Sequence, residues 1–163
     1  METKIISETI PINPYYLDNN IKTHMLNLLK QNIQGTCTLS NGYIISVNKI
    51  IELGDNIISS ANSFIIFNIK YEITYIKPEI QKVYYGKVCM ILENGIFVYI
   101  ENMLKILIPS TTLKYVKYKI DTNTFNNEDI TINIGYDIYV EITAIKYETN
   151  MFRCIGKMVE NQL

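Results

Sequence analysis

The sequence has no tryptophan, one histidine (His24) and one arginine (Arg153). A single histidine with no second histidine or cysteine in range offers no metal site, so we expect His24 to be a surface residue of a helix. Because nearly all positive charge is on lysine, the two-pronged recognition of guanine or phosphate that arginine provides is scarce. The three cysteines, Cys37, Cys89 and Cys154, lack the spacing of a disulfide framework or a zinc site. We therefore expect no metal, no cofactor and a reducing, intracellular compartment.

Motifs that carry catalysis are also missing. The chain contains no GxSxG, no GxxxxGK phosphate loop, and neither HExxH nor CxxC. Its carboxylates are scattered along the sequence without pairing signals. No apolar run reaches the ~18 residues of a membrane span, and no basic-then-apolar leader opens the chain. The sequence therefore predicts a non-enzyme that does not contact a membrane.

Charge and composition restrict the partners. With 48% hydrophobic and 19% charged residues, the chain can bury a core and is not expected to be disordered except at its ends. A formal net charge of −1 excludes a protein that grips duplex DNA unaided, because such binding needs a concentrated basic surface. Any contact with nucleic acid must come from a local patch. The abundance of isoleucine and tyrosine favours strands, and the isoleucine, asparagine, tyrosine and lysine bias suggests an AT-rich genome.

The first part of the chain is predicted to fold as β-α-β-β-β. The expected elements are a strand at 5–12, a helix from about 18 to 32, and strands at 33–39, 43–53 and 64–76. Asp18 or Asn19 is expected to cap the helix, and Gly54-Asp55-Asn56 is expected to form a turn. In the last strand the odd-numbered residues from Ile65 to Tyr75 are all apolar, which predicts that this face is buried.

Lys77-Pro78 marks the expected boundary between two domains, at residues 1–77 and 78–163. Proline cannot donate into a strand ladder, so the first sheet should not continue through it. The second domain is predicted to be a five-stranded OB barrel with a long connection after its third strand. Its strands are expected at 83–92, 96–100, 105–108, 137–146 and 152–158, with a shorter one at 130–134. The fold class is therefore α+β and mostly β.

One hairpin carries the strongest functional signal. Asn94-Gly95 is expected to be its tight turn, because both residues tolerate positive φ. Alternation places Lys87, Phe97 and Tyr99 on the outer face, where rings beside a lysine can stack and hold single-stranded RNA. The alternative is that the aromatic rings only cover a sheet, as they do in many strands.

A lysine-rich segment follows the third strand of the barrel. Lys114, Lys117 and Lys119 alternate with Tyr115 and Tyr118, which is typical of single-strand binding. Lys105 and Arg153 could extend this patch across the barrel. The alternative is a solvated connection without a partner.

Several segments, taken in order, resemble the larger stalk subunit of multi-subunit RNA polymerases. This is the seventh-subunit family of eukaryotic polymerase II, with the E-type subunit as its archaeal form. The resemblance spans about residues 4 to 158, and its strength lies in the order of the segments rather than in any one of them. They are Pro14-Tyr15-Tyr16, Ile33-Gln34-Gly35-Thr36-Cys37, Asn41-Gly42-Tyr43-Ile44-Ile45, the strand 64–77 before Pro78, Gly86-Lys87-Val88, Asn94-Gly95-Ile96-Phe97-Val98 and Ile155-Gly156.

The resemblance implies a tip domain that docks on the polymerase core and an OB domain that contacts nascent single-stranded RNA. It also implies a smaller helical stalk partner, which a divergent polymerase could lack. By position, the residues that resemble the core-facing tip are Tyr15, Tyr16, Gly54, Asp55, Asn56 and Ile57. The candidates for RNA contact are Lys87, Phe97, Tyr99 and Lys105 on the barrel, together with Lys117 and Tyr118 in the connection.

This chain departs from the family pattern at Glu101-Asn102, where a second glycine is usual. The departure and the composition suggest a divergent member from a large DNA virus or an AT-rich eukaryote. It would then act in the nucleus, or in the host cytoplasm or virion if viral. Two alternatives stay open: a free-standing single-stranded RNA-binding OB protein of translation or RNA decay, and an interaction module whose RNA surface has decayed.

Overall fold

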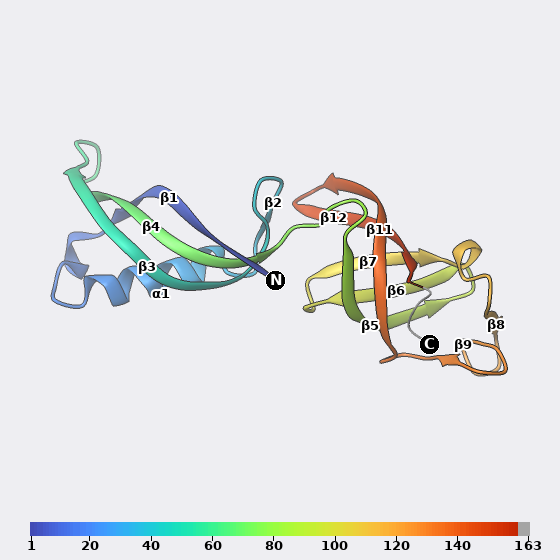
Figure 1. The fold of residues 1–163 in the computed structure, drawn as a ribbon. Helices are drawn as coiled ribbons and strands as arrows, with labels where there is room; N and C mark the ends of the chain where they lie inside the picture. The colour runs from blue at the N-terminus through green and yellow to red at the C-terminus, as the bar shows by residue number, and fades with distance from the viewer. Residues whose placement is uncertain (160–163) are drawn as a thin grey trace. The chain divides into compact units, whose positions relative to one another are not determined.

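The computed structural model describes residues 1–159 and divides the chain into two units, one from Met1 to Ile76 and one from Lys77 onward. Unit 1 is an open sheet covered by a helix, and unit 2 is a closed barrel (Figure 1). The mostly β fold class, with an N-terminal β-α-β-β-β arrangement before a five-stranded OB-type barrel, is confirmed.

Unit 1 has four strands in the order β1-β4-β3-β2, and its helix lies on one face of the sheet (Figure 1). All strand pairs are antiparallel. The elements are β1 (Glu2–Ile12), the short 3-10 helix η1 (Pro14–Tyr16), α1 (Ile21–Ile33), β2 (Cys37–Thr38), β3 (Gly42–Ile58) and β4 (Ile65–Ile76).

The core of unit 1 lies between α1 and the sheet. Met25 and Leu29 are the buried residues of the helix, and they belong to the same cluster as Phe67, Ile69 and Ile73 of β4. Each such side chain contributes roughly 1.5–3 kcal/mol when it leaves water. The prediction that the odd-numbered residues of β4 form the buried face is confirmed by this cluster.

The predicted turn at Gly54-Asp55-Asn56 is wrong. These residues lie inside β3, which runs on to Ile58 opposite β4. The strand inserts an extra residue at four places, one of them between Leu53 and Asn56, and such bulges bend and twist a strand without ending it. Gly54 fits this bulge because a Cβ there would lie 2.9 Å from the Asn68 carbonyl oxygen of β4. Residues that are typical of a turn therefore allow two strands to lie close together here.

The helix cap also differs from the prediction. Asn20 occupies the cap position of α1, and its side chain makes no capping hydrogen bond. Asp18 lies just outside the helix, where its carboxylate accepts a hydrogen bond from the Asn20 amide at 2.7 Å. Asp18 therefore orders the segment that leads into the helix without capping the helix itself.

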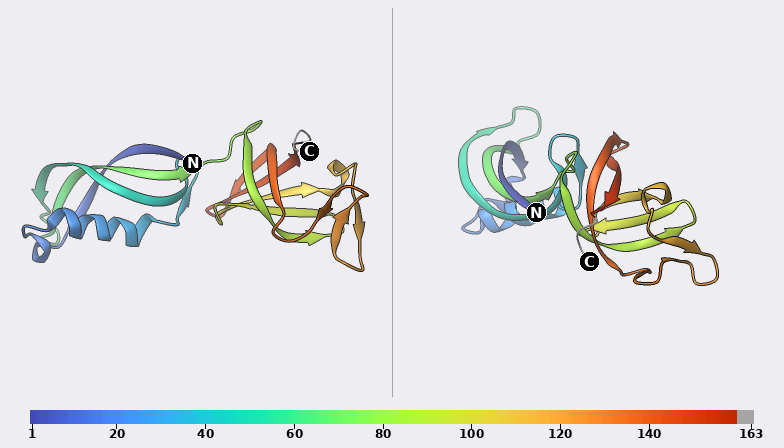
Figure 2. Two further views of the ribbon diagram at one scale, coloured as in Figure 1. Left: turned by 60° about the horizontal axis from the view of Figure 1, so that its bottom comes forward. Right: turned by 45° about the vertical axis from the view of Figure 1, so that its right-hand side comes forward.

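Unit 2 is a barrel that closes in the order β11-β12-β7-β6-β5 (Figure 2). Only the β12–β7 pair is parallel among the barrel pairs of the described residues. Alternate residues of every strand fill the interior, so the remaining residues face outward. The barrel strands are β5 (Val83–Leu92), β6 (Gly95–Ile100), β7 (Leu104–Pro109), β11 (Asp137–Glu148) and β12 (Met151–Met158).

The β5–β6 hairpin forms as predicted, but its turn residues are different. Leu92 pairs with Gly95, so the turn consists of Glu93 and Asn94. Neither has positive φ, and Asn94-Gly95 is therefore not the central pair of the turn.

The lysine-rich connection contains a small sheet of which sequence analysis expected one strand. After η2 (Ser110–Thr112), a three-stranded sheet forms in the order β10-β9-β8. Its strands are β8 (Lys117–Lys119), β9 (Thr124–Asn126) and β10 (Thr131–Ile132), and β10 lies within the strand predicted at 130–134. β8 and β9 were missed, because strands of three residues are too short to show alternation.

Candidate nucleic-acid interface

Three of the predicted RNA-contact residues are neighbours on the outer face of the barrel. Lys87 of β5 pairs with Tyr99 of β6, and Tyr99 pairs with Lys105 of β7. Paired residues on adjacent strands point to the same side of a sheet, so one ring lies between two ammonium groups.

Lys105 connects this group to the second predicted ring. Its ammonium lies 4.5 Å from the ring centre of Phe97 and 5.9 Å from that of Tyr99. Tyr99 is 37% exposed and Phe97 is half-buried. Cation–π attraction holds the lysine over the rings, and that position leaves its charge available to a phosphate beside a stacked base.

Lys87 has a partner that sequence analysis missed. Its ammonium lies 2.8 Å from the Asp137 carboxylate, and the two residues are opposite each other on β5 and β11. Hydrogen bonds from Lys87 and then Tyr85 lower the pKa of Asp137, and the carboxylate in turn raises the pKa of Lys87. Since Asp137 is far from Lys87 in sequence, only strand pairing could reveal that it balances this charge.

Lys117 and Tyr118 lie in β8 of the small sheet, which is separate from the strands of the barrel. Tyr118 packs on the buried ring of Phe125, with the ring centres 5.4 Å apart, and donates a hydrogen bond to Asn123 at 2.9 Å. Its ring is therefore committed to the fold of the small sheet. Lys117 and Lys119 lie on the opposite face of β8 and are exposed.

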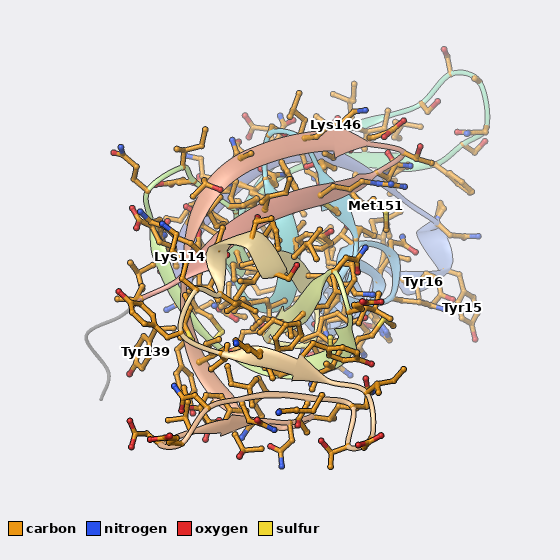
Figure 3. The ribbon with its side chains drawn as sticks, turned by 90° about the vertical axis from the view of Figure 1, so that its right-hand side faces the viewer. Tyr15, Tyr16, Lys114, Tyr139, Lys146 and Met151 are labelled. Atoms are coloured by element: carbon orange, nitrogen blue, oxygen red, sulfur yellow. The ribbon has the colours of Figure 1, made fainter. Side chains whose placement is uncertain are left out.

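The predicted polymerase-contact residues lie at one end of the sheet of unit 1. Ile12 and Ile58 pair with the same residue of β4, Ile65, so η1 and the end of β3 lie at the same end. Tyr15 is 85% exposed there, and Ile58 is 75% exposed. Figure 3 shows Tyr15 and Tyr16 together at the edge of unit 1. We call Tyr15, Tyr16, Leu17, Ile57 and Ile58 the tip patch; sequence analysis had missed Leu17 and Ile58.

Local contacts hold the tip patch in place. The Asn13 side chain accepts a hydrogen bond from the Tyr15 amide at 3.0 Å, which starts η1. The Tyr16 ring contacts the ring of His24 with centres 5.2 Å apart, and His24 lies 3.3 Å from the Asp18 carboxylate. His24 therefore links η1 to the helix, which gives the only histidine of the chain a structural role.

Two of the three cysteines, Cys89 and Cys154, have thiols that hold their protons more tightly than usual. Burial raises the pKa of Cys89, and it raises the pKa of Cys154 to about 12. Among residues 1–159, no three histidine, cysteine or acidic side chains lie close enough together to hold a metal ion. No helix in the same residues is long and apolar enough to cross a membrane.

Comparison with known proteins assigns both units. The SHS2 domain found in the N terminus of Rpb7p/Rpc25p/MJ0397 matches residues 7–86, and the S1 RNA binding domain matches residues 77–156. The DNA-directed RNA polymerase II subunit RPB7 of Glycine max is 19% identical, with 98% of this chain and 92% of the relative aligned. The chain is an Rpb7-like stalk subunit of RNA polymerase. It is a non-catalytic subunit.

A second full-length relative agrees with this assignment at a similarly low identity. The DNA-directed RNA polymerase II subunit 7 of Arabidopsis thaliana is 18% identical over the same shares of the two chains. Among solved structures, the solution structure of GSP13 from Bacillus subtilis covers 53% of this chain and 65% of its own, with 17% identity and a TM-score of 0.38. A superposition this loose adds nothing to the assignment of either unit.

The turn between β6 and β7 contains the two residues at which the sequence was expected to depart from the family pattern. Glu101 and Asn102 both adopt positive φ, at 52° and 56°. This is the region that glycine favours, and asparagine enters it more easily than glutamate does. The chain therefore makes this turn without a glycine.

Proposed function

We propose that this chain docks on the core of an RNA polymerase through the tip patch of unit 1 and contacts nascent RNA through the outer face of the barrel. The observation that carries the proposal is the gathering of five exposed apolar side chains at the end of unit 1. Matches to Rpb7-type subunits over nearly the whole chain support the same reading.

The tip patch has the composition of a protein-binding surface. Large exposed apolar side chains grouped at one end of a small unit favour association with another protein, because each removes apolar surface from water on binding. Tyrosine is enriched at such interfaces since its ring is apolar and its hydroxyl can stay hydrated. Tyr15 and Tyr16 present their rings at 85° to each other, so they offer two different contact planes.

The barrel offers a weaker and different kind of contact. Two rings and two lysines on one face can stack bases and attract phosphates, each stacked base adding roughly 1–3 kcal/mol. With a net charge of −1, the whole chain does not concentrate RNA around itself. This arrangement suits a subunit that meets RNA at a place where the polymerase already holds the transcript.

Two further expectations follow from the family and belong to the same proposal. A smaller helical stalk partner would bind this chain, and the complex would act in the nucleus, or in host cytoplasm or a virion if the source is viral. Relatives named as polymerase II subunits in two plants support the first of these compartments.

Affinity purification of the tagged full chain from its source tests the docking surface. The wild-type chain should recover the large polymerase subunits, and the double variant Tyr15→Ser, Ile58→Ser should recover less than about a tenth as much, because interface anchors of this kind dominate binding. Ile5→Ser is the matched control, since Ile5 is an exposed isoleucine of the same unit outside the tip patch.

Recovery of RNA without polymerase subunits would contradict the proposal and favour the alternative of a free-standing RNA-binding protein. Equal loss of polymerase in the Ile5→Ser control would show that the tip patch is not the docking surface. Circular dichroism of each variant should match the wild type, because none of the substituted side chains is part of the core.

A further inference from the structure

Strand register extends the Lys87–Tyr99–Lys105 group into a longer row. On β7 and β12, which run parallel, Ile106 lies opposite Cys154, so the preceding residues Lys105 and Arg153 are neighbours on the outer face. Arg153 in turn pairs with Lys146 of β11. We call Lys146, Arg153, Lys105 and Lys87, with Tyr99 between the last two, the basic row.

The basic row brings together charges that are dispersed in the sequence. Asp137, at the start of β11, pairs with Lys87 and ends the row, while Lys146 lies near the other end of the same strand. Figure 3 shows this separation, with Tyr139 and Lys146 labelled toward opposite ends of β11. Lys146 has an exposed carboxylate partner, Glu148, at 3.4 Å. Within residues 1–159 neither Arg153 nor Lys105 forms an ion pair, so their charges are not balanced by a carboxylate as those of Lys87 and Lys146 are.

An apolar row runs beside the basic row. Ile155 pairs with Leu107, Leu107 with Phe97, and Phe97 with Met90. Ile155 and Met90 are exposed, and the two central residues are half-buried. A bulge after Val88 places Met90 on the outer face, opposite Phe97, so this row crosses the four strands β12, β7, β6 and β5.

Acidic groups lie beyond the opposite side of the basic row. Glu101 lies in the turn just after Tyr99, and Glu148 follows Lys146 by two residues along β11. A phosphate chain would be repelled from that side and attracted to the cations. The bases of a bound strand would then turn toward the apolar row, where Phe97 supplies a ring.

We propose that single-stranded RNA crosses the barrel perpendicular to its strands, with its phosphates along the basic row and its bases over the apolar row. This inference rests on the proposed RNA contact and assigns Arg153 and Lys146 as phosphate contacts. Neighbouring strands are about 4.8 Å apart, so the row from Lys146 to Lys87, which follows the curve of the closed barrel over its five strands, is roughly 19 Å long. That length accommodates a short strand at the lower end of the ~4–16 nucleotides that OB folds bind.

Binding of a fluorescent oligouridine RNA of about twelve nucleotides to the full chain tests the path, with anisotropy measured between about 50 and 200 mM KCl. Each phosphate contact contributes about 0.7 to the slope of log affinity against log salt for single strands, so Arg153→Gln should lower the slope by that amount. Lys146→Gln should lower it by less, because Glu148 already balances part of its charge.

Lys157→Gln is the matched control, because Lys157 is an exposed cation of the same strand outside the row, with Glu141 at 3.5 Å. It should leave affinity and slope unchanged. Phe97→Leu keeps an apolar side chain but removes the ring, so it should weaken binding about fivefold or more without changing the slope. A lower salt slope identifies a phosphate contact, whereas weaker binding at an unchanged slope identifies a base contact.

Equal effects of Arg153→Gln and Lys157→Gln would overturn the path. So would a lower slope in a Lys117→Gln, Lys119→Gln variant with no change in Arg153→Gln, because RNA would then follow the small sheet. Absence of any RNA binding at the lowest salt would also overturn it. The docking proposal fails on a different readout, the recovery of polymerase subunits, so the two failures are distinguishable.

Discussion

The two units differ in the kind of side chains that they expose and in where those side chains lie. Unit 1 is an open sheet whose exposed feature is apolar and lies at one end, in the tip patch. Unit 2 is closed, has no free barrel edge, and presents its main feature on the outer side of its strands, as the basic row beside an apolar row. An apolar end suits a protein partner, and alternating charge and rings suit a nucleic acid.

The difference shows how a chain with a net charge of −1 can still contact RNA. Strand pairing in the barrel gathers four of the 15 basic residues into one row, while acids are placed beyond one side of it. In unit 1, charges on the uncovered sheet face are instead balanced across strands, as Lys70 and Glu52 are at 3.2 Å. Local arrangement therefore matters more than net charge.

The largest effect on stability is expected from a substitution in the core of unit 1. Met25 is fully buried between α1 and the sheet, so Met25→Ala should lower the free energy of unfolding of unit 1 by about 2–5 kcal/mol. Lys22→Ala, on the exposed side of the same helix, should change it by less than about 0.5 kcal/mol. Hydrogen exchange with mass spectrometry reads each unit separately, and equal loss of protection in both units after Met25→Ala would contradict separate cores.

A second substitution would break the closure of unit 2. A Cβ on Gly86 would lie 2.4 Å from the Tyr99 carbonyl oxygen, which belongs to the backbone of β6 and cannot move aside. Gly86→Ala should therefore cost about 3 kcal/mol, at the upper end of overpacking effects. Gly135→Ala is the control: it has open space but a φ of +91°, so only backbone strain of about 1 kcal/mol is expected. Denaturant unfolding of the two variants at equal midpoints would refute the steric explanation.

The dependence of stability on pH would test whether the Cys154 thiol is buried and neutral in the core of unit 2. Burial raises the pKa of Cys154 to about 12, so the folded state keeps its proton where the unfolded chain loses it. This stabilisation is full below the unfolded pKa near 9 and falls as pH rises above it. Between about pH 9 and 10 the free energy of unfolding should drop by about 1 kcal/mol more in the wild type than in Cys154→Ala. Parallel pH profiles of the two proteins would contradict a buried neutral thiol.

The smallest effect is expected when Lys87 of the basic row loses its carboxylate partner, Asp137. Asp137 holds the Lys87 ammonium at 2.8 Å, so Asp137→Asn should free that charge for phosphate. We expect RNA affinity to rise about twofold to fivefold and the salt slope to steepen by up to about 0.7. Asp129→Asn, an exposed acid near the small sheet, is the control and should change neither value. A fall in affinity after Asp137→Asn would show that the ion pair positions Lys87 for binding.

The sequence predicted the elements of both units well because their patterns are long. Apolar alternation in residues 64–76 identified the buried face of β4, and the strands of the barrel were placed within a few residues. The failures have local causes. Gly54-Asp55-Asn56 is typical of a turn but forms a bulge, and β8 and β9 of the small sheet are too short to show a period.

The candidate surfaces were only partly predictable for a related reason. Lys87, Phe97 and Tyr99 lie on one hairpin, so alternation was enough to propose them together, and the family resemblance added Lys105. Arg153 was expected only as a possible extension of the lysine-rich patch, and Asp137 and Lys146 were not expected, because no spacing in the sequence brings these residues to the same row. Sequence analysis proposed Tyr118 for base stacking. Its contact with Phe125 was not expected, because that contact depends on a small sheet that the sequence pattern does not predict.

The sequence by itself determined which side chains face outward wherever a strand is regular, because that depends on a period of two residues; bulges, as after Val88, shift the pattern. It also determined the order of the elements and the family. Only the tertiary structure decided which outward side chains stand next to one another, because the stagger between strands is set by backbone pairing, by bulges and by closure of the barrel. The residues of the basic row and the Asp137 carboxylate at its end come together only in the folded barrel. The tip patch likewise forms because segments distant in the sequence end at the same edge of a sheet.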